Sequence, residues 1–140
     1  MAKAMLRHTH PVPLEQGLFL VPILSATFDE LRERFPDVAD PVEPDLWKFS
    51  GPLALIAERL SHLGAVAYVE TDYFGGVGSQ AAMAWKAGEV IMPATKDEAG
   101  PINTALRLLG VKARLLLDEF DTVGLGAHRH NEDWLGLEAD

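Results

Sequence analysis

The sequence predicts an α+β protein with a mainly antiparallel sheet and about four helices packed on one face of it. Three observations predict this class. The chain has 140 residues, enough for one hydrophobic core, so a single domain over residues 1–140 is expected. Apolar residues make up 48% and charged residues 24%, as in folded proteins. Helix patterns stand on both sides of a central run of strand patterns, an order typical of α+β folds.

The first third of the chain predicts a strand, a helix and an exposed connection. The apolar run at residues 17–24 predicts the strand. Thr27 and Glu30 have the spacing of a capping box, with Thr27 as the cap, and Pro36 ends the helix that follows. Residues 36–45 hold three prolines and four acids and predict an exposed connection.

The second helix has the clearest pattern. It is expected to follow a short strand at residues 46–49 and to begin at residues 50–52, where serine can cap and proline suits the first turn. Gly64 is placed to end it. Its apolar stripe consists of Leu53, Ile56, Leu60 and Leu63.

The middle of the chain predicts the sheet. Residues 65–74 have the composition of a central strand, and residues 80–85 and 89–92 predict further antiparallel strands. The short connection at residues 86–88 contains glycine and predicts a hairpin.

The last third predicts two more helices and a polar tail. One helix covers residues 101–109 and ends at Gly110, and the other covers residues 113–123. Residues 1–14 and 135–140 are expected to be flexible. The side chains of the last helix that are expected to face inward are Leu116, Leu117 and Phe120.

Charge and composition narrow the classes of function. With 21 acids and 12 bases the net charge is −9, which disfavours nucleic acids and anionic membranes and favours a basic protein partner. The absence of cysteine excludes disulfides and thiolate sites. The longest apolar run, at residues 18–24, is too short to cross a bilayer, and the basic N-terminus lacks an apolar signal core. We therefore expect a cytoplasmic protein, and the sequence indicates no cofactor.

A glycine-rich segment at residues 73–80 is the main landmark. It could form a hairpin or bulge, a recognition loop for a partner, or a phosphate-binding nest. A nucleotide loop should open a helix, whereas this one precedes a predicted strand and lacks a following lysine, so the hairpin is favoured. The residues expected to contact a partner are Glu70, Asp72, Tyr73, Phe74, Gly75, Gly76 and Gln80. The acidic connection at residues 36–45 is a second candidate surface.

Two groups of side chains could bind a metal. Glu70 and Asp72 share one face of a strand with Tyr68 and could hold a cation or divide acid and base roles, although a solvated strand face is the simpler interpretation. In an extended tail, three side chains would share a face and could ligate zinc: His128, His130 and Glu132. In the structural alternative, Arg129 pairs with an aspartate and Trp134 anchors the tail.

Three blocks of the second half resemble a known class of protein. They are the segments at residues 74–82, 102–110 and 118–134. Together they resemble small bacterial immunity proteins, which are encoded beside secreted toxins. The resemblance implies a non-catalytic protein that binds and blocks a cognate toxin.

The leading hypothesis is therefore a non-enzymatic binding protein of the immunity type. The alternative is a small metal-dependent enzyme or metal-binding domain that uses Glu70, Asp72, His128 and His130. A third hypothesis is a ligand-binding regulator in which the glycine segment serves as a lid.

Overall fold

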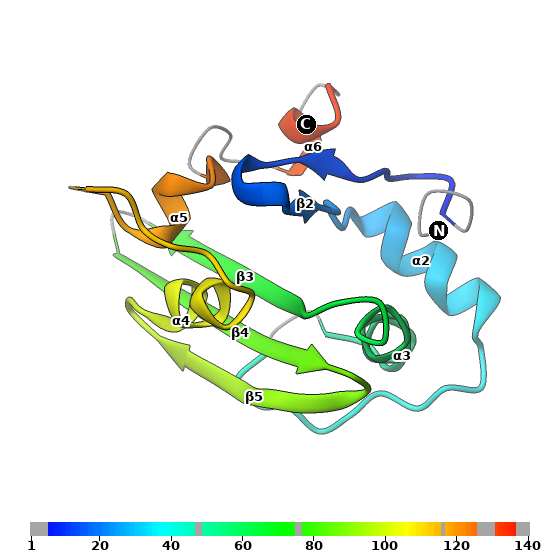
Figure 1. Ribbon diagram of the computed structural model, residues 1–140. Helices are drawn as coiled ribbons and strands as arrows, with labels where there is room; N and C mark the ends of the chain where they lie inside the picture. Colours follow the sequence, from blue (N-terminus) through cyan, green and yellow to red (C-terminus); the bar gives the residue numbers. More distant parts are fainter. Residues whose placement is uncertain (1–5, 47–48, 75–76, 116, 126–130, 137–140) are drawn as a thin grey trace. The chain divides into compact units, whose positions relative to one another are not determined.

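The computed structural model describes residues 6–46, 49–74, 77–115, 117–125 and 131–136 (Figure 1). Within these ranges the side chains at 72–74, 77–78 and 132–133 are not described. Helices and antiparallel sheets occur together, so the predicted α+β class is confirmed. None of the described helices is long and apolar enough to cross a bilayer.

The chain divides into two compact units. The terminal unit comprises Met1–Val38 and Ala113–Asp140, and the central unit comprises Ala39–Lys112. Each unit has its own sheet. The single domain expected over residues 1–140 stays a prediction.

The terminal unit contains a small sheet and a ten-residue helix. β1 (Val12–Pro13) pairs antiparallel with β2 (Phe19–Leu20), and the 3-10 helix η1 (Glu15–Gly17) lies between them. α2 (Ser25–Arg34) follows. The strand expected at residues 17–24 is therefore much shorter than its apolar run.

The capping-box pattern placed the start of α2 too late. Thr27 lies inside the first turn, where its Oγ1 accepts the N–H of Leu24 at 3.1 Å. Thr27 thus stabilises the helix start from within the helix, and it does not act as the cap. Glu30 has other partners, which are described with the candidate site.

The predicted helix over residues 113–123 is wrong for most of that range. Among the described residues of this range, α5 (Glu119–Thr122) is the helical part, and Asp118 caps its start: the Oδ1 of Asp118 accepts the N–H of Asp121 at 2.8 Å. Residues 113–115 and 117–118 are not helical, and the Oγ1 of Thr122 accepts the N–H of Arg114 at 2.9 Å.

The side chains of that segment also differ from expectation. Leu117 is 46% exposed and does not face inward, Phe120 is half-buried, and Leu116 lies outside the described residues. A further short helix, α6 (Asn131–Trp134), was not predicted. The Nδ2 of Asn131 donates to the carbonyl of Ile23 at 3.0 Å, a contact that ties α6 to the chain before α2.

The central unit is built on a three-stranded antiparallel sheet. Its strands are β3 (Val66–Phe74), β4 (Val77–Lys86) and β5 (Glu89–Asp97), in the order β3-β4-β5 (Figure 1). All three strands were predicted, and two of them are longer than their patterns indicated. β4 pairs with both neighbours and is the central strand.

β4 is buried on both of its faces. Ala81, Met83 and Trp85 form one apolar cluster with Ala57 of α3 (Gly51–Leu60). The alternating residues Ala82 and Ala84 form another with Ala105 of α4 (Pro101–Leu108). Because successive side chains of a strand point to opposite faces, α3 and α4 cover opposite faces of the sheet. The expectation of helices on one face was wrong here.

The start of α3 agrees with its sequence signals. The Oγ of Ser50 accepts the N–H of Leu53 at 3.3 Å, and the Oδ1 of Asp40 accepts the N–H of Gly51 at 2.8 Å. The helix ends at Leu60, before the predicted cap, so Leu63 lies beyond it and is 72% exposed.

The strand expected at residues 46–49 is not present at its described ends. Leu46 and Phe49 are outside any strand, and residues 47–48 lie outside the described residues. Both described side chains nevertheless pack in the cluster on the α3 face, where the rings of Phe49 and Trp85 are stacked with centroids 5.9 Å apart.

The turn between β4 and β5 is fixed to the end of α3. Ala87 and Gly88 both have positive φ angles, 53° and 81°, as a tight two-residue hairpin requires. The N–H of Gly88 donates to the Oγ of Ser61 at 2.8 Å, and the N–H of Ala87 donates to the carbonyl of Ser61 at 2.8 Å. A Cβ on Gly88 would lie 2.6 Å from Cε1 of His62.

The change Gly88→Ala is expected to lower the free energy of unfolding by about 1 kcal/mol, because alanine is strained at this positive φ angle, whereas the exposed ring of His62 can turn away from the new Cβ. Adding His62→Ala should therefore leave the cost of Gly88→Ala nearly unchanged. Urea unfolding of the single variant, the double variant and the wild type measures the strain. If Gly88→Ala unfolds at the wild-type urea concentration, this description of the turn is wrong.

Candidate protein-binding site

The glycine-rich segment connects two antiparallel strands. Pairing of β3 with β4 runs without a shift to Phe74 and Val77, on either side of Gly75 and Gly76. The segment is therefore a hairpin connection, and it does not open a helix as a phosphate-binding loop would. Gly75 and Gly76 themselves lie outside the described residues.

The strand register brings the expected contact residues to one end of the sheet. We call this the hairpin end: residues 70–74 of β3, residues 77–81 of β4, residues 96–97 of β5, and Glu98, which directly follows β5. Glu70 pairs with Ala81, and Gln80 pairs with both Thr71 and Asp97. Asp72, Tyr73 and Phe74 belong to β3, but their side chains lie outside the described part of the structure.

Glu70 is held beside an aromatic cluster. Its Oε2 accepts the hydroxyl of Tyr68 at 2.7 Å, and the rings of Tyr68 and Phe49 have centroids 4.9 Å apart. Burial, together with the hydrogen bond and the charge of Glu70, raises the pKa of Tyr68 far above its ordinary value. Tyr68 therefore stays protonated and fixes the carboxylate of Glu70 at the rim of the α3 face.

Gln80 lies on the other face of the sheet. Its neighbour Ala81 pairs with Glu70, so Gln80 points away from Glu70, towards α4. There its Oε1 accepts the N–H of Ile102 at 3.0 Å, in the first turn of α4. The sequence grouped Gln80 with Glu70 as contact residues, whereas the sheet separates them and gives Gln80 a contact at a helix start.

The described charges at the hairpin end are mainly acidic. Asp97 and Glu98 are exposed at the end of β5, and Glu70 lies two strands away. Lys96 is the described base among them. The excess of acid seen in the composition is thus present at this end of the sheet. The chain connecting the two units at residues 36–45 is also largely exposed, as expected.

The tail candidates for a metal site lie outside the described part of the structure. His128 and His130 lie outside the described residues, and so does the side chain of Glu132 in α6. Among the side chains that the structure describes, no three histidines or carboxylates are grouped so that they could hold a metal ion.

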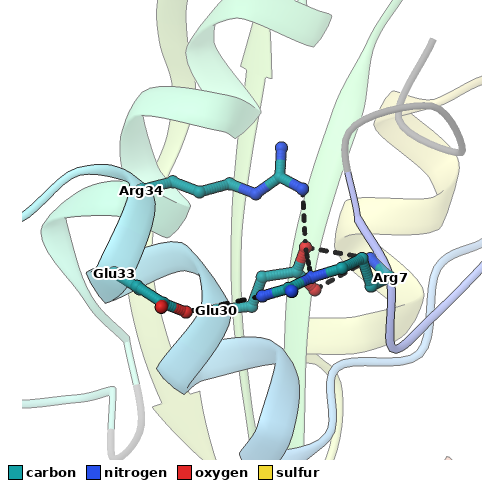
Figure 2. A network of polar contacts seen from close by, with 4 residues as sticks. All are labelled: Arg7, Glu30, Glu33 and Arg34. Atoms are coloured by element: carbon teal, nitrogen blue, oxygen red, sulfur yellow. Dashed lines mark hydrogen bonds and ion pairs between the residues drawn. The ribbon is translucent and has the colours of Figure 1, made fainter.

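The structure also reveals a charged cluster that the sequence patterns did not indicate. Figure 2 shows Glu30 of α2 between Arg7 and Arg34. Both carboxylate oxygens of Glu30 accept the backbone N–H of Arg7, at 2.8 and 2.9 Å, and Nη2 of Arg34 lies 2.9 Å from Oε2. Arg7 also reaches the exposed Glu33, with Nη2 3.4 Å from Oε2.

The Glu30 carboxylate is buried and remains charged. Burial by itself raises its pKa, but the N–H of Arg7 and the charge of Arg34 outweigh that effect and hold the pKa below its ordinary value. Its side chain is 1% exposed, whereas that of Glu33 is 74% exposed. The cluster joins the N-terminal segment to α2, so it is structural in character.

Other contacts reinforce this attachment. Leu6 and Thr9 are buried, and the hydroxyl of Thr9 donates to the carbonyl of Pro22. Residues 6–9 thus make specific contacts within the terminal unit. The flexibility expected for residues 1–14 and 135–140 stays a prediction.

Comparison with known proteins gives no relative: no protein-family model, no curated protein and no solved structure matches this chain. The resemblance to immunity proteins stays a hypothesis drawn from the sequence.

The change Gln80→Ala should lower the free energy of unfolding by about 1 to 2 kcal/mol, because the first turn of α4 loses an acceptor for the N–H of Ile102. Gln80→Glu keeps an acceptor oxygen near the helix N-terminus and should restore most of that loss. Thr71→Val, at the exposed position paired with Gln80, is the control. Urea unfolding is the measurement, and equal stability of Gln80→Ala and the control would refute the helix-cap role.

The change Glu30→Gln should cost about 2 kcal/mol at pH 7, because hydrogen bonds to a buried charge are lost. Glu33→Gln changes an exposed partner of Arg7 on the same helix and should cost under about 0.5 kcal/mol. The lowered pKa means that the contribution of Glu30 is present above the ordinary glutamate pKa and is lost as pH falls through the folded-state value. Chemical unfolding from pH 7 to pH 3 should therefore show the two stabilities converging, and parallel pH curves would contradict this.

Proposed function

We propose that this protein is a non-enzymatic binding protein of the immunity type, which binds and neutralises a cognate bacterial toxin. The observation that carries the proposal is the acid excess: a net charge of −9, with Glu70, Asp97 and Glu98 at the hairpin end of the sheet. The resemblance of the three sequence blocks to immunity proteins supports the same class.

An acidic surface favours a basic partner in two ways. The summed negative field speeds the encounter with a positively charged surface, and it disfavours competing polyanions. The sheet supplies a rigid platform for this field, because β4 is buried on both faces and Tyr68 fixes Glu70 beside the aromatic cluster. A binding surface of this kind needs no chemistry of its own; it blocks the partner by occupying it.

Most of the binding energy would come from a few buried side chains on this acidic surface. Interfaces typically depend on a small number of buried aromatic or arginine side chains, surrounded by contacts of little energy. Tyr73 and Phe74, which the sequence predicts as contact residues, are in β3 immediately before the glycine connection. We propose that they serve as anchors, with the acidic side chains around them directing the approach.

The test is made on the toxin candidate encoded beside this gene. The candidate domain is expected to be basic, to arrest growth when expressed alone, and to be tolerated when this protein is expressed with it. Binding measured by calorimetry should weaken as salt is raised, because charges are screened over about 10 Å at 0.1 M salt. If the neighbouring genes encode no toxin, or if the candidate neither binds nor is neutralised, the proposal fails.

Two charge-reversed variants can show which end of the sheet contacts the basic partner. Glu98→Lys changes the charge at the hairpin end, and Glu89→Lys makes the same change at the opposite end of β5, where Glu89 pairs with Lys86. Glu98→Lys should slow association with the basic partner about tenfold at low salt, more than the control, because local charges dominate steering. Stopped-flow association rates measure this, and equal effects of the two changes would contradict the assignment.

A further inference from the structure

The two edges of the central sheet are built differently. At one edge, β5 carries register shifts against β4 between Ala82 and Ala84 and again between Ala84 and Trp85. It also contains Pro93, which has no N–H to donate, and the exposed Lys96. Bulges, proline and lysine are the devices by which proteins prevent an edge strand from pairing with another chain.

The other edge lacks these devices. β3 pairs with β4 over nine consecutive residues, from Val66 with Trp85 to Phe74 with Val77, with no register shift. Its sequence, VAYVETDYF, has neither proline nor a basic residue. In the part of the chain that the structure describes, β4 is the strand that pairs with β3. The outer side of β3 therefore carries a regular row of N–H and C=O groups about 30 Å long.

A second copy of the chain is a poor occupant for this edge. Two β3 strands paired antiparallel about their midpoint would bring Glu70 opposite Glu70, because Glu70 is the central residue of Val66–Phe74. Like charges directly opposite each other destabilise a sheet. Each copy also has a net charge of −9, which adds repulsion between copies.

A basic extended segment would be attracted to this edge, whereas a second copy of the chain would be repelled. Its side chains would face Glu70, whose carboxylate is fixed at the rim by the hydroxyl of Tyr68 at 2.7 Å. Across the sheet, Lys96 shares the face of Glu70 and Asp97 points to the opposite face, so attraction of a basic segment rests on Glu70 and on the net charge of −9. Main-chain hydrogen bonds would supply affinity, and the charge pattern would select the partner.

We propose that the outer edge of β3 in the described sheet binds an extended, basic segment of a partner protein as an added strand. This inference rests on the proposed function, because it names the surface by which the basic toxin would be held. Within the described strands, β5 is the protected edge of the sheet and β3 is the edge that lacks bulges, proline and lysine.

The test uses a nine-residue peptide that alternates lysine with valine, and a control peptide with glutamate in place of lysine. Hydrogen exchange of the full-length protein is followed with and without each peptide. The lysine peptide should slow exchange in residues 66–74 about tenfold or more while residues 89–97 stay unchanged, and the glutamate peptide should have no effect. A lysine peptide with alternate backbone nitrogens methylated should lose the effect, because it cannot donate to the edge.

Glu70→Gln should weaken binding of the lysine peptide about twofold to fivefold, whereas Glu89→Gln should not. No protection of residues 66–74, equal protection by the glutamate peptide, or protection confined to residues 89–97 would each overturn the inference. Protection of residues 66–74 that rises with protein concentration alone, with a dimer in sedimentation, would instead assign the edge to a second copy. The toxin candidate is tested in parallel. If the toxin binds without protecting β3 from exchange, this inference is overturned and the proposed function stands. If the peptide protects β3 but no toxin partner exists, the proposed function is overturned and this inference stands.

Discussion

Burial of β4 on both faces is the constraint on which the central unit depends. Five consecutive residues, Ala81 to Trp85, are buried, and they point alternately to two sides. The large side chains of Met83 and Trp85 face α3, whereas Ala82 and Ala84, with no exposed area, face α4. Small residues on that side allow the helix to approach, and α4 presents Ala105, which is also fully buried. A slip of one residue in β4 would place the large side chains against the alanine side, so the register is strongly specified.

The position of the candidate site follows from this register. Because pairing of β3 with β4 is fixed from Val66 to Phe74, Glu70 must share a face with Ala81, and Gln80 must lie opposite. The sheet also determines what each side chain can do. Glu70 is held beside an aromatic cluster, in an outer strand of the described three-stranded sheet, whereas the oxygen of Gln80 accepts a hydrogen bond from α4. Part of the acid excess of the chain thus lies at the hairpin end of the sheet, in Glu70, Asp97 and Glu98.

Elements with local signals could be predicted from the sequence. Ser50 and Pro52 mark the start of α3, Gly110 follows α4, and the Ala87-Gly88 pair supplies the positive φ angles of the hairpin. Each signal acts on the few residues around it, so one sequence is enough to recognise it. The burial of β4 on both faces was also visible in principle, because a continuous apolar run is typical of a strand covered on both sides.

Features that depend on distant contacts could not be predicted. Glu30 had a plausible role in a capping box, but its partner Arg7 is 23 residues away. The leucine pattern near Leu117 resembled a helix, although Asp118 starts a new, shorter one and Arg114 is held by Thr122. Glu70 and Gln80 lie on opposite faces because of the register in which β3 and β4 pair. The sequence of one strand alone does not determine that register. The function is the least constrained, because charge selects a kind of partner and not an individual one.

The central claim is that α3 and α4 cover opposite faces of β4, and methyl NMR tests it most directly. Nuclear Overhauser contacts should connect the Ala105 methyl group with Ala82 or Ala84, and the Ala57 methyl group with Ala81, Met83 or Trp85. Contacts from Ala57 and Ala105 to the same alternate set of β4 residues would place both helices on one face. That result would contradict the account of the sheet and of the site at its hairpin end.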